Sequence, residues 1–212
     1  MSLIDITLPM SNRLASWPGD TPCDFRLAWK MSEGASVNVG SLTTSVHSGT
    51  HTDAPFHFLP DGQTIDQLDL TPYVGPAVVV DVRGREVIRI EDLPRDLDLR
   101  ATPRLLLKTD WWTDITRFPE RIPVLAPGVP TALRARGVTL IGVDVPSVDA
   151  LDSKDLPIHH EIGRCGIYIL ENLALSHVAP GAYELIALPL KLLGADGAPV
   201  RAALRVPTPN RT

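Results

Sequence analysis

The sequence has few cysteines, no long apolar run and no excess of positive charge. Its two cysteines, Cys23 and Cys165, lie far apart and form no C-x-x-C pair. A disulfide framework is unusual at this density, so we expect two reduced, buried thiols in a cytoplasmic protein. No stretch reaches the ~18 apolar residues of a membrane helix. The N-terminus lacks the basic and apolar regions of a secretory signal, so none is expected.

The charge and the missing motifs also argue against several classes of function. A formal net charge of -5 provides no basic surface for nucleic acid or for an anionic membrane. The chain contains neither a P-loop nor a G-x-G-x-x-G, which argues against nucleotide binding. It has no G-x-S-x-G, and neither cysteine has a histidine near it in sequence. Serine or cysteine hydrolysis is therefore not expected.

Short apolar runs rich in β-branched residues predict a strand-rich domain. They cover residues 3–7, 77–82, 104–108, 138–143, 166–170 and 183–193. Their lengths and turn-rich borders favour strands, and the continuous runs indicate strands covered on both faces. Residues 130–136, followed by Gly137, predict a short helix, and a similar helical piece is expected over residues 90–93, ending before Pro94. We therefore expect one α/β domain over residues 1–212, with a strand-rich core and short peripheral helices.

Three of the six histidines fall within the eleven residues HSGTHTDAPFH that begin at His47. Imidazole and carboxylate together suit zinc and other first-row divalent ions. In an extended chain His47, His51, Asp53 and His57 would face the same side, but a straight strand would separate His47 from His51 by ~13 Å. The two can bind one ion only if the chain bends, and Gly49 is the natural place for the bend. A helical turn and a kinked loop remain equally open.

Further ligands must come from elsewhere, because three ligands leave the coordination of a metal incomplete. Glu171 directly follows the apolar run 166–170, and a carboxylate at the end of a buried strand is costly unless it is paired or bound to metal. His159, His160 and Glu161 are the other candidates, in a loop that Pro157 would make rigid. A surface loop of histidines and a structural metal site are the alternatives. Structural zinc sites are usually rich in cysteine, however, whereas histidine and carboxylate with open positions are typical of catalytic ones.

The pattern H-x-G-T-H-x-D-x-P-x-H from His47 to His57 resembles the signature of the cyclase-type metal-dependent hydrolases. That family includes bacterial kynurenine formamidases (arylformamidases) and isatin hydrolases. The resemblance continues through WPGDTP at Trp17, VNVG at Val37, YVGPA at Tyr73 and ILENL at Ile169, over nearly the whole chain. It implies a swivelling β/β/α fold, a homodimer and a centre of two divalent metal ions, usually zinc.

The resemblance also implies which residues bind the metals. The matching ligands are His47, His51, Asp53, His159 and Glu171. Asp53 would bridge the two ions and Glu171 would touch both. Isatin hydrolases carry an amide side chain at the position that matches Glu171, so the carboxylate of Glu171 favours the formamidase branch. His160 is the adjacent alternative to His159.

The remaining roles follow from the same resemblance. His57 matches the general acid/base, and Trp17 matches a residue that packs against the aromatic ring of the substrate, although a Trp before Pro-Gly-Asp can also simply cap a turn. The implied reaction is the hydrolysis of N-formyl-L-kynurenine to L-kynurenine and formate, a step of tryptophan degradation, by metal-activated water. The alternatives are a related hydrolase acting on another small amide, an isatin-like cyclic amide or a lactone, and a metal-stabilised binding protein without turnover.

Overall fold

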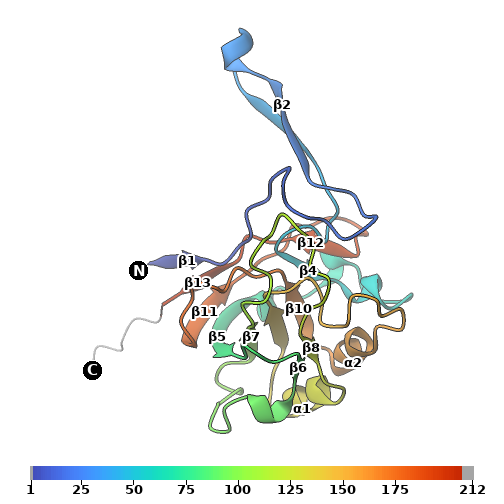
Figure 1. The fold of residues 1–212 in the computed structure, drawn as a ribbon, viewed down its shortest axis with the longest axis vertical. Helices are drawn as coiled ribbons and strands as arrows, with labels where there is room; N and C mark the ends of the chain where they lie inside the picture. The colour runs from blue at the N-terminus through green and yellow to red at the C-terminus, as the bar shows by residue number, and fades with distance from the viewer. Residues whose placement is uncertain (1, 207–212) are drawn as a thin grey trace.

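The computed structural model describes residues 2–206, which form a strand-rich body with a projecting two-stranded arm (Figure 1). A nine-stranded sheet makes up most of the body. In sheet order its strands are β1 (Leu3–Asp5), β13 (Ala203–Arg205), β11 (Gly181–Ile186), β5 (Val74–Asp81), β7 (Arg104–Lys108), β9 (Leu140–Val143), β10 (Tyr168–Glu171), β4 (His51–Asp53) and β12 (Gly197–Pro199). The predicted fold class, a strand-rich α/β core with short peripheral helices, is confirmed.

The four central strands, β5, β7, β9 and β10, run parallel and are covered on both faces. Successive side chains of a strand point to opposite faces, and β7 shows this division clearly. Leu105 and Leu107 join one apolar cluster, whereas Leu106 joins the other. Helices α1 (Val129–Ala135) and α2 (Pro157–Cys165) pack on the side of the first cluster through Leu133 and Ile162. The expectation of strands buried on both faces therefore holds at the centre of the sheet.

The helical predictions were only partly correct. The helix expected over 130–136 is α1, but the piece expected from residue 90 is a single 3-10 turn, η5 (Ile90–Asp92). The rigid loop expected around Pro157 was wrong, because Pro157 is the first residue of α2. At that position the missing N–H of proline costs no helical hydrogen bond. The strand expected over 183–193 ends at Ile186. Of the two free thiols, Cys23 is buried as expected, whereas Cys165 is partly exposed.

Smaller elements complete the described chain. Strands β6 (Val87–Ile88) and β8 (Val124–Leu125) form a short parallel pair. The other 3-10 turns are η1 (Met31–Glu33), η2 (Pro55–His57), η3 (Ile65–Gln67) and η4 (Thr71–Tyr73). Among the described residues, no helix is both long and apolar enough to cross a membrane.

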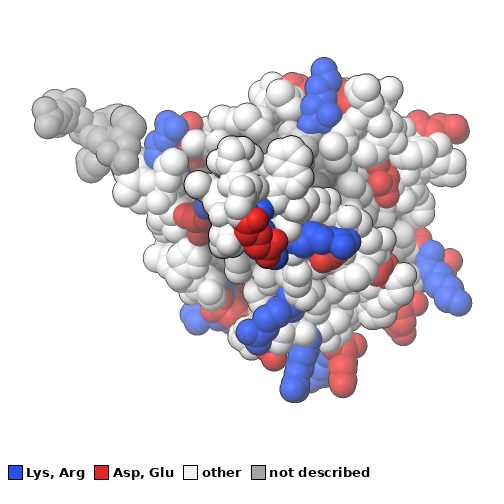
Figure 2. All heavy atoms as spheres, turned by 90° about the horizontal axis from the view of Figure 1, so that it is seen from above, with Lys and Arg blue, Asp and Glu red and all other residues white. Residues whose placement is uncertain are grey.

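The arm consists of β2 (Asp24–Trp29) and β3 (Val39–Thr43), which pair with each other and project away from the body (Figure 1). Seven large apolar side chains of the arm are exposed: Phe25, Leu27, Trp29, Met31, Val37, Val39 and Leu42. Figure 2 views the molecule from the side of the arm and shows charges of both signs interspersed over this face. These two strands were not predicted from the sequence.

Candidate metal centre and active site

Near one edge of the large sheet, strand pairing brings distant parts of the sequence together. Strand β4 pairs with β10 in antiparallel register, with His51 opposite Glu171 and Asp53 opposite Ile169. Residues directly opposite each other project from the same face, so the side chains of His51 and Glu171 meet. Asp53 lies two residues beyond His51 and shares that face. Three of the five predicted ligands are therefore placed by this one strand pair.

His47 reaches the same place through a turn. Gly49 has a φ of +67°, in the left-handed region that favours glycine. The chain therefore bends where the sequence analysis expected it to bend, and it enters β4 directly afterwards. Of the two local structures left open, the kinked turn is the one observed. Beyond β4, the 3-10 turn η2 carries His57.

His159 comes from the first turn of α2, and Asp149 fixes it there. The Asp149 carboxylate accepts hydrogen bonds from the backbone N–H groups of Ile158 and His159, both at 3.0 Å. It also lies 2.7 Å from Nδ1 of His159, so the same carboxylate holds the helix start and the imidazole. Glu161 is engaged elsewhere, because it accepts hydrogen bonds from the backbone around the start of α1. Of the described clusters that could hold a metal, none includes His160.

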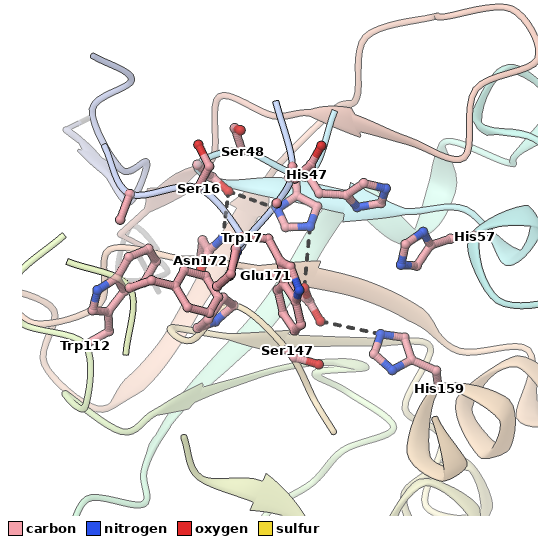
Figure 3. Close-up of a pocket in the computed structure, with 18 of the residues that line it drawn as sticks. Ser16, Trp17, His47, Ser48, His57, Trp112, Ser147, His159, Glu171 and Asn172 are labelled. Atoms are coloured by element: carbon pink, nitrogen blue, oxygen red, sulfur yellow. Dashed lines mark hydrogen bonds and ion pairs between the residues drawn. The ribbon is translucent and has the colours of Figure 1, made fainter. Parts of the chain in front are cut away.

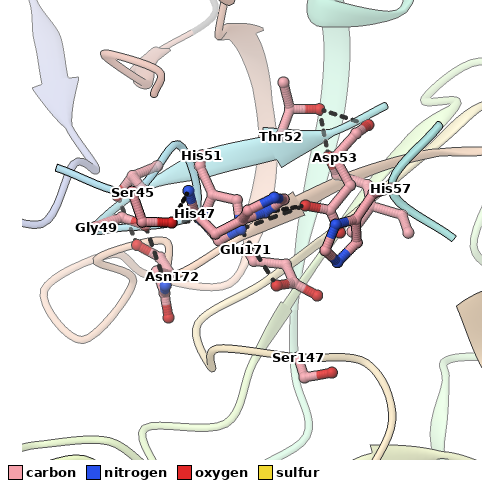
Figure 4. Close-up of polar contacts among 12 residues, drawn as sticks. Ser45, His47, Gly49, His51, Thr52, Asp53, His57, Ser147, Glu171 and Asn172 are labelled. Atoms are coloured by element: carbon pink, nitrogen blue, oxygen red, sulfur yellow. Dashed lines mark hydrogen bonds and ion pairs between the residues drawn. The ribbon is translucent and has the colours of Figure 1, made fainter. Parts of the chain in front are cut away.

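The converging side-chain atoms are spaced as metal ligands are (Figure 4). Nε2 of His51 lies 3.4 Å from Asp53 Oδ1 and 3.4 Å from Glu171 Oε2. Nε2 of His159 lies 3.5 Å from Asp53 Oδ2 and 3.7 Å from Glu171 Oε1. Hydrogen bonds of this type are shorter, at roughly 2.7–3.2 Å. Ligands ~2.0–2.1 Å from a tetrahedral zinc ion, in contrast, lie about 3.3 Å from each other.

Two buried carboxylate oxygens strengthen this interpretation. Oδ2 of Asp53 and Oε1 of Glu171 are buried and have no hydrogen-bond partner among the described residues. A buried oxygen of this kind is costly unless a donor or a cation compensates it. Each of them faces Nε2 of His159 across a distance that suits an ion between them. The residues present therefore fit a divalent metal.

The second ring nitrogen of each predicted histidine ligand has a polar partner within the protein. A metal-bound histidine usually donates its other N–H to a carboxylate or a backbone carbonyl. Nδ1 of His51 lies 2.9 Å from the backbone oxygen of Gly49, and Asp149 occupies Nδ1 of His159. The ring of His47 is oriented the other way round. Its Nδ1 lies 3.0 Å from Asp53, on the side of the candidate metal site, and its Nε2 lies 3.0 Å from Asp196.

The buried imidazoles and carboxylates of the site shift one another's pKa values. Burial by itself would lower the pKa of His51, but hydrogen bonds to Asp53 and Glu171 outweigh it and raise that pKa to about 10. Burial likewise opposes Asp149 and Asp53 at His159, whose pKa rises to about 10. The pKa of Glu171 is raised by burial and by the charge of Asp53. The buried carboxylates therefore favour positive charge beside them, which a divalent metal ion would supply when bound.

Three groups among residues 2–206 have the composition and spacing of a metal site. One of them, His47 with His57 and Asp196, includes neither Asp53 nor Glu171, and the other two contain one or both of these buried carboxylates. One contains His47, His51 and Asp53, and the other contains Asp53, His159 and Glu171. Asp53 belongs to both. The structure therefore brings the five predicted ligands into one continuous group, in which Asp53 connects two sets of three.

A cavity of about 520 Å³ opens beside this group (Figure 3). Trp17, Trp112 and Phe118 line it together with His47, His57 and three of the buried candidate ligands, His51, His159 and Glu171. The ring of Phe118 stands edge-on to Trp17 at 5.2 Å between centroids and also contacts Trp112, so the aromatic residues form one continuous wall. Trp17 also begins a turn, because its carbonyl accepts a hydrogen bond from the N–H of Asp20. Trp112 and Phe118 were missed, because no motif or spacing relates them to Trp17.

His57 lies between the cavity and the solvent. Its ring centroid is 4.1 Å from that of His47, and the side chain is 32% exposed. Its Nδ1 lies 3.4 Å from a carboxylate oxygen of Asp196, a residue that the sequence analysis did not identify. A histidine in this position can contact a bound substrate and still exchange protons with water.

Comparisons with known proteins agree with this geometry. The model of the Cyclase family, described as "Putative cyclase", matches residues 4–150. The kynurenine formamidases of Geobacillus thermodenitrificans and Bacillus cereus are each 52% identical to this chain over 202 residues, which cover 95% of this chain and 96% of theirs.

Solved structures show the same fold. A potential metal-dependent hydrolase with cyclase activity superposes with a TM-score of 0.81 at 26% identity, covering 97% of this chain and 99% of that chain. Isatin hydrolase A from Ralstonia solanacearum shares the fold with a TM-score of 0.82 at 22% identity, covering 97% of this chain and 92% of that chain. The resemblance inferred from the sequence is therefore confirmed, and the chain belongs to the Cyclase family.

Proposed function

We propose that this protein is a kynurenine formamidase, which hydrolyses N-formyl-L-kynurenine to L-kynurenine and formate. The observation that carries the proposal is the group of five candidate metal ligands at an aromatic-walled cavity of about 520 Å³. The identity of 52% to relatives named kynurenine formamidase supports the choice of substrate. N-formyl-L-kynurenine has an aromatic ring for the cavity wall and a formamide for the polar end.

We further propose that the site holds two divalent metal ions and that both are zinc. His47, His51 and Asp53 would hold one ion, and Asp53, His159 and Glu171 the other. Nitrogen and carboxylate ligands without cysteine sulfur suit zinc and neighbouring divalent ions. When bound, such ions supply Lewis acidity, which lowers the pKa of water and stabilises negative charge on a carbonyl oxygen.

The remaining residues have roles of their own in the proposed reaction. Trp17, Trp112 and Phe118 would hold the aromatic ring and keep water from that side of the cavity. With the ring against this wall, the formamide would lie towards Glu171, which lines the same cavity. Hydrolysis breaks the bond between the formyl carbon and the aromatic amine, and the departing nitrogen needs a proton. His57 lines the cavity and would donate it.

The test is an assay of kynurenine formation by metal-replete and chelator-treated protein. We expect turnover that chelation abolishes and that added zinc restores. His57→Ala should keep its bound metal and lose about 10²- to 10⁴-fold in kcat, which is the usual contribution of general acid–base catalysis. His177→Ala is a matched control, because His177 is exposed and its ring contacts only the backbone of Asp5 among the described hydrogen bonds.

Three outcomes would overturn the proposal. They are the absence of turnover in metal-replete protein, turnover that is indifferent to chelation, and a preference for isatin or simple formanilides over N-formyl-L-kynurenine. Coincident loss of metal in His57→Ala would instead identify His57 as a ligand.

We also propose that the protein is a homodimer formed by one domain per chain, over residues 1–212, and that it acts in the cytoplasm. Free Cys23 and Cys165 suit a reducing compartment. The arm supports the dimer, because an isolated two-stranded hairpin is marginally stable and this one exposes Phe25 and Trp29 at 49% and 60%. Light scattering should give twice the mass of the chain, and a monomeric mass would contradict the dimer.

A further inference from the structure

Asp196 is a carboxylate beside the site that the proposed function leaves without a role towards the substrate. It directly precedes β12, far in sequence from the histidine motif. Its Oδ2 lies 3.0 Å from Nε2 of His47 and 3.4 Å from Nδ1 of His57. One oxygen atom thus contacts the imidazole of a candidate metal ligand and the imidazole of the candidate general acid.

The backbone ties Asp196 and His57 to the same residue. The N–H of Ala54 donates to the carbonyl of Asp196 at 2.8 Å, and the N–H of His57 donates to the carbonyl of Ala54 at 2.9 Å. Ala54 is fully buried, so this connection is well shielded from water. The relative positions of the carboxylate and the imidazole are therefore set by the main chain as well as by their side-chain contact.

The residue after Asp196 is a glycine, and its lack of a side chain makes room for the ring of His47. Gly197 pairs with Asp53 across the β4–β12 ladder. A Cβ atom on Gly197 would lie 2.9 Å from Cε1 of His47, which is closer than such atoms approach. Glycine at this position leaves room for the His47 ring, so that its Nε2 can face Asp196.

The carboxylate of Asp196 faces Nδ1 of His57 at 3.4 Å, the long end of the hydrogen-bond range. A carboxylate accepts hydrogen bonds and so favours the tautomer in which Nδ1 of the imidazole carries the proton. Nε2, on the opposite edge of the ring, is then the atom that exchanges protons with a substrate.

We infer that Asp196 is a positioning residue, which orients His57 for proton transfer to the departing amine and links it to His47. This inference rests on the proposed function of the site. It goes beyond a role in holding His47 alone, which would affect metal binding but not proton transfer. Asp149 behind His159 provides the comparison, because it is a carboxylate in the same relation to a ligand histidine and has no described contact with His57.

The first test compares Asp196→Asn with Asp149→Asn, each alone and combined with His57→Ala. Because Asp196 also contacts His47, Asp196→Asn is assayed at saturating zinc, where the site is filled. Under these conditions we expect it to lower kcat by about 10- to 100-fold and to leave KM within about 2-fold, since misplaced groups cost rates of this order. In the His57→Ala background the same change should have no further effect, because the two residues act as one unit. Asp149→Asn should instead weaken metal retention by about 10- to 100-fold. Its effect should multiply with that of His57→Ala.

A series of ring-substituted formanilides gives a second readout. Amines with electron-withdrawing substituents leave without much help from an acid, so the loss caused by Asp196→Asn should shrink along the series, in parallel with that of His57→Ala. A loss that is equal for all substrates, or that multiplies with His57→Ala, would overturn the inference. A loss of activity in proportion to lost metal would do the same, because Asp196 would then act through His47 alone.

A spectroscopic measurement keeps the inference separate from the proposed function. ¹⁵N NMR of the histidine side chains should show His57 protonated on Nδ1 in the zinc-loaded protein, and this preference should be lost in Asp196→Asn. An unchanged tautomer would overturn the inference whatever the substrate is. If the wild-type protein fails to hydrolyse any formanilide, the proposed function fails, and the NMR result still decides the role of Asp196.

Discussion

Replacement of Asp53 by asparagine removes one negative charge from the centre of the site and keeps the size of the side chain. Asp53 is buried, and its two oxygens face different histidines. Oδ1 lies 3.0 Å from Nδ1 of His47, and Oδ2 lies 3.5 Å from Nε2 of His159. An amide offers only one oxygen and turns an NH₂ group towards the other partner. Because Asp53 belongs to both proposed metal-binding sets, this substitution should weaken the binding of both ions.

The size of the effect follows from the linkage between binding and stability. A metal ion present at about 100 times its dissociation constant stabilises the fold by about 2.7 kcal/mol. For a domain of 150–250 residues, 1 kcal/mol shifts Tm by roughly 2–4 °C, so one ion raises Tm by roughly 5–11 °C and two ions by about twice as much. Asp53→Asn should lose nearly all of this increment. Its bound metal should fall from about two ions per chain to well below one.

The assay is metal analysis of the purified variant together with thermal unfolding in the presence of zinc and of chelator. Asp61→Asn is the control, because Asp61 is exposed and lies outside both metal clusters. The control should keep both ions and the full zinc-dependent increment in Tm. A variant at Asp53 that loses one ion and retains the other would refute the shared role of this carboxylate, and so would an unchanged increment.

Two further predictions concern pH and the substrate. The metal-free protein should lose stability as the pH rises from about 6.5 towards 10, because the pKa of His51 and His159 is raised to about 10 in the folded state. A raised histidine pKa contributes stability that is complete below the unfolded value of about 6.5 and is lost as the pH passes the folded value. Urea unfolding of chelator-treated protein at pH 6.5, 8 and 9.5 measures this, and a midpoint that stays constant or rises would count against it. Trp17→Ala should raise KM by roughly 2- to 12-fold, the equivalent of about 0.5–1.5 kcal/mol for an aromatic contact, with a smaller change in kcat. Steady-state kinetics would contradict this if KM were unchanged.

The sequence predicted the centre of the fold better than its edges. The runs that became β5, β7, β9 and β10 have continuous apolar stretches, such as residues 78–80 and 105–107, because these strands are covered on both faces. Strands β4 and β12 each have only three residues, and their pairing depends on contacts far apart in the chain. Neither has a local pattern long enough to indicate a strand.

For the candidate site, the residues of the histidine motif were identified in advance, and the residues that support them were not. His47, His51 and Asp53 stand close together in sequence, so their composition alone draws attention. Asp149 and Asp196 are single carboxylates with no local signal, and only the folded chain places them against imidazole nitrogens. The choice of ligand among His159, His160 and Glu161 likewise has no local signal, because it depends on how the first turn of α2 faces the sheet.

The most direct test of the two-metal account is a titration of zinc into chelator-stripped protein, with bound metal and kynurenine formation measured at each step. The account predicts that activity rises with bound zinc and reaches its plateau at about two ions per chain, in line with the two clusters that share Asp53. A plateau at one ion per chain, or full turnover by metal-free protein, would contradict it.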